Sequence, residues 1–223
     1  EQMPGGWTVT LDGRSIKTPA RAPLCLPSQR LARAIAAEWN DQDEIIDLMS
    51  MHLTRLANVA IDRTPGARAE MADEAARYVA TDLLCYLADG PEELRRLQDE
   101  AWSPLRAWAA SDMGVALEVT AGLSPVDQPA ESIEAVRAHA EGLDDWRLTG
   151  LVFGIGLCGS AVLGLAIEQG RLNAREAFEL SRVDEAFQES IWGEEAEARR
   201  ITERRRAEAA ALDLWFDALK DAG

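Results

Sequence analysis

Residues 148–167 read LTGLVFGIGLCGSAVLGLAI, the longest stretch of the chain without a charged side chain. Its length would allow it to span a bilayer. However, five glycines interrupt it, no aromatic belt marks its ends, and Asp144, Asp145 and Glu168 flank it where a membrane span carries basic residues. We therefore expect a buried central helix of a helical bundle and no membrane insertion. A membrane span is the disfavoured alternative.

The glycines of this stretch need a reason in packing, because an interior glycine costs a helix about 1 kcal/mol relative to alanine. We expect tight packing on several sides, so that Gly156→Leu or Gly159→Leu destabilises the fold by overpacking, by about 1–3 kcal/mol. Residues 154–159 also match the GxGxxG pattern of dinucleotide sites. That pattern needs a preceding strand and a βαβ unit, whereas the sequence that follows is typical of helix, so we favour helix packing.

The regions on either side of this stretch are also mostly helical. Asn173 and Glu176 resemble a capping box that opens a helix running to Ile191. Trp192-Gly193 breaks that helix, and a long charged helix follows over residues 194–220. On the N-terminal side, apolar spacing predicts helices over residues 71–87, 94–105 and 133–143 and a short strand over residues 115–119.

The first sixty residues combine strand and helix signals. Apolar and polar side chains alternate from Trp7 to Leu11, and Asp12-Gly13 is a strong hairpin signal, so a small sheet is expected. Helices are predicted over residues 28–42 and 51–62, and Thr64-Pro65-Gly66 breaks the pattern. The sequence thus predicts a predominantly helical α+β protein. A small β-rich region with flanking helices occupies residues 1–64, and a multi-helical domain occupies residues 65–223.

Composition narrows the functional classes. The chain has 223 residues, with 23 Lys and Arg against 39 Asp and Glu, and its net charge is −16. So acidic a chain repels phosphate backbones and anionic lipids, so we expect neither nucleic acid nor a membrane as partner. The same charge favours a monomer or a weak dimer.

The sequence supplies little for catalysis. Its three cysteines are far apart and fit small buried hydrophobic residues in a reducing compartment. Its two histidines, His52 and His139, belong to no metal-ligand spacing. No catalytic triad, phosphate-binding loop or paired-cysteine motif is present. We therefore predict no catalytic residue, no cofactor, no metal and no enzymatic activity.

An acidic cluster surrounds Trp192-Gly193. Tryptophan is enriched at binding hot spots, and the carboxylates beside it would match a basic partner. The alternative is a solvated helix face whose glutamates pair with the basic residues of 199–206. The candidate binding residues are Glu185, Glu189, Trp192, Glu194 and Glu195.

Several ordered motifs resemble one family. They are LDGR at 11–14 with KTPA at 17–20, LPS at 26–28 with AIAAEW at 34–39, LTRLAN at 53–58 with AID at 60–62, YVATDLLCY at 78–86, and FQ at 187–188 with WG at 192–193. Together they are similar to the assembly chaperones that bind the alpha subunit of the F-type ATP synthase catalytic head. The likeness covers nearly the whole chain and is strongest over residues 11–86.

The resemblance implies a non-enzymatic, ATP-independent chaperone that holds the unassembled alpha subunit and shields the surface that the beta subunit later covers. It implies an acidic functional position at Glu189, Glu194 or Glu195. Mitochondrial members carry a targeting presequence that residues 1–6 do not resemble, so a bacterial cytoplasmic protein is expected. Two rivals stay open. A small-molecule enzyme with a cryptic acidic site would show a deep pocket with converging polar groups, and a general holdase would show a broad exposed apolar patch.

Overall fold

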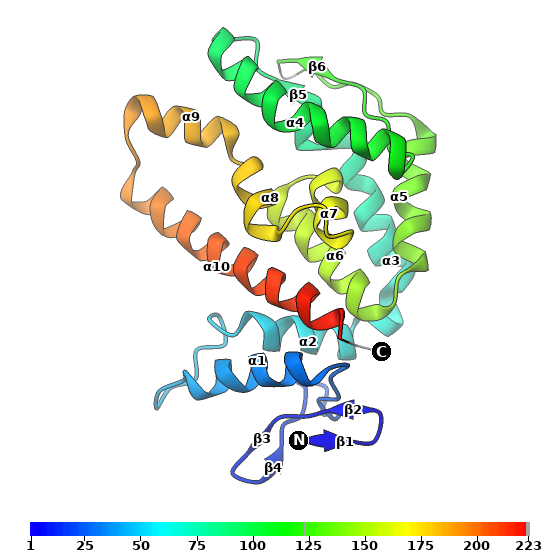
Figure 1. Ribbon diagram of the computed structural model, residues 1–223, viewed down its shortest axis with the longest axis vertical. Coiled ribbons are helices and arrows are strands. Elements are labelled where there is room, and N and C mark those ends of the chain that lie inside the picture. Colours follow the sequence, from blue (N-terminus) through cyan, green and yellow to red (C-terminus); the bar gives the residue numbers. More distant parts are fainter. Residues whose placement is uncertain (123, 222–223) are drawn as a thin grey trace.

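The computed structural model describes residues 1–122 and 124–221, and within them helices dominate over three short strand pairs (Figure 1). The predicted fold class, α+β and predominantly helical, is confirmed. The strands are β1 (Gln2–Met3), β2 (Gly6–Trp7), β3 (Thr10–Leu11), β4 (Arg14–Ser15), β5 (Tyr86–Leu87) and β6 (Thr120–Ala121). The helices are α1 (Gln29–Asn40), α2 (His52–Asp62), α3 (Thr64–Arg77), α4 (Glu92–Asp112), α5 (Ala130–Gly142), α6 (Asp145–Cys158), α7 (Ala161–Glu168), α8 (Ala174–Leu180), α9 (Val183–Trp192) and α10 (Ala196–Leu219).

The N-terminal hairpin forms as predicted. The β3 and β4 strands are antiparallel, Leu11 lies opposite Arg14, and Asp12 and Gly13 both take positive φ values in the turn between them. The loop after the hairpin is tied to the end of α2. The Thr18 hydroxyl donates to one oxygen of Asp62 at 2.6 Å, and the Ala20 amide donates to the other at 3.0 Å. The small sheet is thereby fixed to the helices that cover it.

Helices α1 and α2 are joined at one end by the carboxylate of Glu38. It accepts hydrogen bonds from the backbone amides of Leu53 and Thr54, at 2.7 and 2.8 Å, and from the Thr54 hydroxyl, at 2.7 Å. A carboxylate is well suited to the unpaired amides of a helix N-terminus. Both helices pack against α10, whose C-terminal half lies just above them in Figure 1.

The glycine-rich stretch is buried in the centre of the molecule, but the prediction of one continuous helix is wrong. Gly159 takes φ +66° and ends α6, and the Ser160 hydroxyl then accepts a bond from the Leu163 amide to begin α7. Left-handed glycine is a common helix terminator, and serine is a preferred N-cap. The stretch therefore forms two helices packed on each other, and no helix within the described residues is long and apolar enough to cross a membrane.

The close packing expected of the glycines is present, but at other positions than Gly156 and Gly159. A β-carbon added at Gly164 would lie 2.3 Å from Cγ1 of Ile155, and one at Gly150 would lie 2.6 Å from the ring of Phe216. A β-carbon at Gly156 would meet nothing nearer than 3.9 Å, and one at Gly159 nothing within 4 Å. A β-carbon alone would therefore not clash at either position, and the effect of leucine there stays a prediction; at Gly159 the φ of +66° would strain any side chain.

The helix predicted over residues 71–87 ends early. After α3 the chain forms two 3₁₀ turns, Tyr78–Thr81 and Leu83–Cys85, separated by Asp82. The buried carboxylate of Asp82 accepts hydrogen bonds from the amides of Leu84 and Val162, and so stabilises the start of α7. Burial raises the pKa of Asp82 to about 6, although these backbone hydrogen bonds act in the opposite direction. The side chain of Asp82 thus competes with helix continuation.

Two further element predictions need correction. Residues 115–119 are not a strand. The side-chain amide of Gln128 accepts a hydrogen bond from the backbone amide of Glu118 and donates one to its carbonyl, each at 2.9 Å, so these groups cannot pair with a neighbouring strand. The strand of this region is β6, which pairs in parallel with β5. The capping box of Asn173 and Glu176 is confirmed, but the helix that it opens ends at Leu180, and α9 begins after a break.

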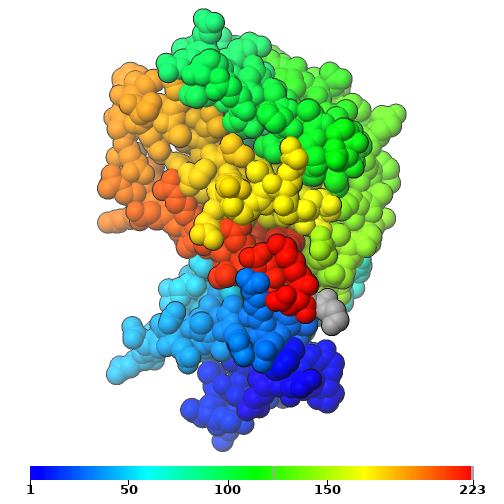
Figure 2. All heavy atoms as spheres, in the orientation of Figure 1, coloured from blue at the N-terminus to red at the C-terminus, as the bar shows by residue number. Residues whose placement is uncertain are grey.

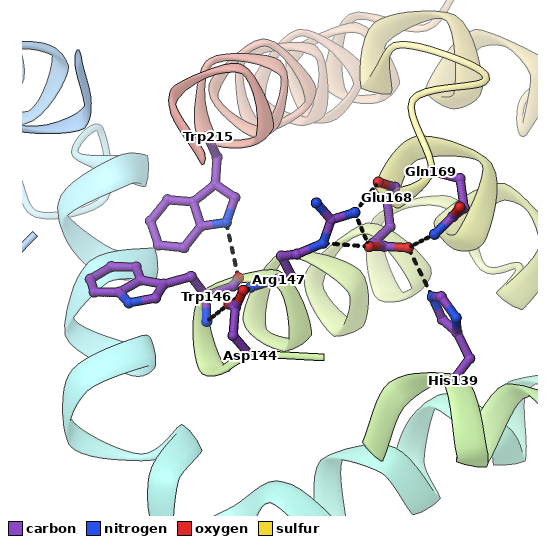
Figure 3. Close-up of polar contacts among 7 residues, drawn as sticks. All are labelled: His139, Asp144, Trp146, Arg147, Glu168, Gln169 and Trp215. Atoms are coloured by element: carbon purple, nitrogen blue, oxygen red, sulfur yellow. Dashed lines mark hydrogen bonds and ion pairs between the residues drawn. The ribbon is translucent and has the colours of Figure 1, made fainter. Parts of the chain in front are cut away.

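A buried carboxylate joins three helices (Figure 3). Glu168 accepts hydrogen bonds from His139 at 2.9 Å, Arg147 at 2.7 Å and Gln169 at 2.7 Å. Burial raises the pKa of Glu168, but these hydrogen bonds outweigh it and leave the pKa below its usual value. Because its donors come from α5, α6 and the end of α7, this cluster is a structural joint in the core.

The hydrophobic core is continuous from the N-terminal sheet to α10. Cys85 and Cys158 are buried in agreement with their interpretation as small hydrophobic residues, and Cys25 is half-buried. Helix α3 follows α2 after Arg63 alone, so the predicted breaker Thr64-Pro65-Gly66 forms the first turn of α3, and the helix is kinked just after it, at Ala67. The division at residue 64 into two domains stays a prediction.

Candidate protein-binding surface

Helix α9 and the start of α10 form one edge of the molecule, at the left in Figure 1, and the connection between them stands away from the core. Gly193 ends α9 with φ +82°, as the Trp-Gly break predicted. None of the described residues of α9 is buried, although the helix has ten residues. A helix with so little burial gains little stability from packing, so its exposed side chains are available for a partner.

Trp192 is at the outer end of α9, with 83% of its surface exposed. Ile191 beside it is 54% exposed. Trp192 is therefore not part of the core. Glu195, at the start of α10, is exposed and forms no ion pair with the residues that the structure describes. A large exposed apolar side chain beside an unneutralised carboxylate is typical of a protein-contact surface.

A hollow of about 610 Å³ lies between α6, α9 and α10 and contains two of the candidate residues, Glu185 and Glu189. Glu189 is paired with Arg182, its oxygen 2.6 Å from the guanidinium. Its large apolar lining residues are Leu83, Tyr86, Leu157, Phe178 and Ile201, and Arg205 adds a second basic side chain beside Arg182. Gly156 also lines the hollow and leaves the backbone of α6 open to it.

The charges along this edge are partly paired. Glu194 accepts a 2.6 Å bond from Arg199, and this bond raises the pKa of the Arg199 guanidinium. Arg206 pairs with Glu179 at 2.6 Å, and this bond holds the pKa of Glu179 below its usual value. Glu194 thus pairs with a basic residue of 199–206, as the solvated-face alternative expects. Of the five candidates, Glu185 and Glu189 lie in the hollow, Trp192 and Glu195 lie at the tip, and Glu194, just before α10, is paired with Arg199.

The sequence did not indicate several residues of this region. Tyr86 was expected in a helix and lies instead in β5, where it reaches the hollow. Phe178 and Ile201 read as ordinary core positions of amphipathic helices. A second groove, of about 630 Å³, runs along the opposite face of α9, with Leu97 and Phe187 in its floor and glutamates at its rim. The two hollows exist because α9 lies between α4 and α10. No local sequence pattern predicts that placement.

Comparisons with known proteins agree over nearly the whole chain. The family described as ATP12 chaperone protein matches residues 1–110. The crystal structure of Atp12 from Paracoccus denitrificans is 41% identical, with a TM-score of 0.89 over 98% of this chain and 94% of that one. A variant of the same protein, with an aspartate replaced by lysine, is 40% identical with a TM-score of 0.89, over 98% of this chain and 93% of that one. A chaperone candidate from Agrobacterium tumefaciens is 33% identical with a TM-score of 0.90, over 98% of this chain and 82% of that one.

These likenesses place the protein in the class of assembly chaperones. At such identity over such coverage they also fix its family: the chain belongs to the ATP12 chaperone family.

Proposed function

We propose that this protein binds the unassembled alpha subunit of the F-type ATP synthase catalytic head, without using ATP, and promotes its assembly. The observation that carries the proposal is the edge formed by α9 and α10, where Trp192 is 83% exposed beside carboxylates in a chain of the ATP12 chaperone family. A subunit released from a ring exposes apolar and charged interface together. A tryptophan with neighbouring glutamates offers both an apolar anchor and a charge match. A cytoplasmic location and a monomeric state stay predictions.

Within this proposal the candidate residues have different roles. Trp192 supplies apolar area at the tip, and Glu195 supplies a charge that no neighbour neutralises. Glu185 and Glu189 act from the hollow, where Arg182 holds Glu189 in place. Glu194 contributes least, because Arg199 already engages it.

The test measures binding of purified alpha subunit to wild type, Trp192→Ala, Glu195→Lys and the control Glu141→Lys at two salt concentrations. Glu141→Lys makes the same charge change at an exposed position of α5, on the opposite side in Figure 1. We expect Trp192→Ala to weaken binding at both salt concentrations. Glu195→Lys should weaken it more at low salt than at high salt, because ions screen exposed charges. The control should bind as wild type does.

Circular dichroism first establishes that each variant is folded. Wild type that binds no alpha subunit would overturn the proposal. If both Trp192→Ala and Glu195→Lys bind the alpha subunit as strongly as wild type does, the α9–α10 edge is not the binding surface. A general holdase, one of the two rival classes, would suppress aggregation of an unrelated protein as well as that of the alpha subunit. Use of ATP by the chaperone would appear as stronger binding when ATP is added.

A further inference from the structure

The loop between α1 and α2 exposes a second apolar cluster, far in sequence from Trp192. Its large aliphatic side chains are Ile45, Ile46, Leu48 and Met49, with exposed fractions of 85%, 51%, 56% and 58%. Single exposed aliphatic residues are ordinary on protein surfaces, but four within five residues concentrate exposed apolar surface in one short loop. We name residues 41–50 the α1–α2 loop.

Hydrogen bonds within the loop hold it in shape. The side chain of Gln42 accepts a bond from the Asp47 amide at 2.8 Å and donates to the Ser50 hydroxyl at 3.3 Å. Asp47 in turn accepts a 2.9 Å bond from the amide of Met49. The base of the loop is held by Glu38, which joins α1 to the start of α2. These bonds engage Gln42, Asp47 and Ser50 within the loop, while its large aliphatic side chains are exposed to solvent.

The charges of the loop are of one sign. Asp41, Asp43, Glu44 and Asp47 surround the aliphatic residues, and no Lys or Arg occurs from residue 34 to residue 54. None of the four carboxylates forms an ion pair with any residue in 1–122 or 124–221. The complement of such a surface is a protein face with apolar pockets and a rim of Lys or Arg. An anionic membrane is disfavoured because it would repel all four carboxylates.

The α1–α2 loop and the connection between α9 and α10 project on the same side of the molecule, at the lower left and upper left of Figure 1. Between them the outline of the molecule is indented (Figure 2). Both elements offer exposed aliphatic or aromatic side chains beside unpaired carboxylates. We propose that the α1–α2 loop is a second docking element, and that it and the Trp192 tip contact the same basic, partly apolar client surface across this indentation.

This inference rests on the proposed function, since it takes the alpha subunit as the client. Its test compares alpha-subunit binding by wild type, Ile45→Ser/Met49→Ser, Glu44→Lys and the control Val119→Ser. Val119 is an exposed aliphatic residue, at 39%, in the segment before β6. We expect the double variant to keep wild-type stability and to bind at least tenfold more weakly. Glu44→Lys should weaken binding mainly at low salt, and Val119→Ser should have no effect.

The outcomes separate this inference from the function on which it rests. Weakening by the loop variants but not by Val119→Ser supports the second docking element. Wild-type binding by the loop variants, while Trp192→Ala binds weakly, overturns the inference and leaves the proposed function intact. Wild type that binds no alpha subunit overturns both. A loop variant that changes only the sedimentation of the chaperone itself, from dimer to monomer, also overturns the inference, because the patch would then serve a second copy of the chain.

Discussion

Gly164→Ala and Gly156→Ala make the same chemical change in adjacent central helices, and the structure predicts opposite effects on stability. At Gly164 the new β-carbon would lie 2.3 Å from Cγ1 of Ile155, 3.0 Å from its amide nitrogen and 3.2 Å from its Cα. Two of these atoms are backbone, so rotation of a side chain cannot relieve the contact. Helices α6 and α7 would have to separate.

The magnitudes follow from these distances. Overpacking of this kind costs about 1–3 kcal/mol, and alanine returns up to about 1 kcal/mol of helix propensity. The net expectation for Gly164→Ala is a loss of about 1–2 kcal/mol. At Gly156 the nearest atom, the Tyr78 hydroxyl, would be 3.9 Å away. That variant should gain about 0.5–1 kcal/mol from helix propensity alone.

The assay is urea unfolding followed by circular dichroism, with the slope of the transition checked for constancy. The two variants should differ by about 1.5–3 kcal/mol, which for a chain of this size corresponds to about 3–12 °C in melting temperature. Equal stabilities, or a Gly156→Ala variant less stable than Gly164→Ala, would refute the assignment of tight packing to Gly164.

Three more predictions concern the joints of the fold. Glu38→Ala should cost about 1–3 kcal/mol in urea unfolding, since the amides at the start of α2 lose their acceptor; an unchanged midpoint would contradict this. Asp82 has a raised pKa, so the folded state binds its proton more tightly, and its stabilising contribution falls as pH rises from about 4 to about 6. The free energy of unfolding of wild type should therefore fall by about 1 kcal/mol relative to that of Asp82→Asn when urea unfolding is repeated at pH 7 instead of pH 5. A difference between the two that does not change with pH would contradict the raised pKa. Glu168→Gln should cost about 2–4 kcal/mol by calorimetry, because Arg147 and His139 lose their anionic partner, and wild-type stability would be evidence against this joint.

Local signals predicted most of the elements correctly. The hairpin at Asp12-Gly13, the Ser28 cap of α1 and the capping box of Asn173 each depend on backbone chemistry within a few residues. The break at Gly159 was accessible too, because a glycine followed by serine is a helix stop followed by a helix start. The uninterrupted apolar character of residues 148–167 concealed it.

Contacts between residues far apart in the chain could not be predicted from local sequence patterns. The end of the helix at Asp82 depends on Val162, eighty residues later, and the loss of a strand at residues 115–119 depends on the side chain of Gln128. The candidate surface was partly predictable, since Trp192 and its glutamates are adjacent in sequence. The hollow was not, because Tyr86 and Leu157 meet Glu189 only through the arrangement of α6 and α9.

Most of the motifs that carried the family resemblance lie outside the surface proposed to bind the client, and the exception is the Trp-Gly pair at 192–193. Thr18, Glu38 and Asp82 all belong to those motifs, and each forms a joint between elements rather than a contact with solvent. Substitution of such residues would destabilise the fold, so weaker client binding there says little about the interface. The Trp192 tip and the α1–α2 loop are exposed and can be changed without loss of core packing. Variants at these two places are therefore the ones that can separate a defect in binding from a defect in folding.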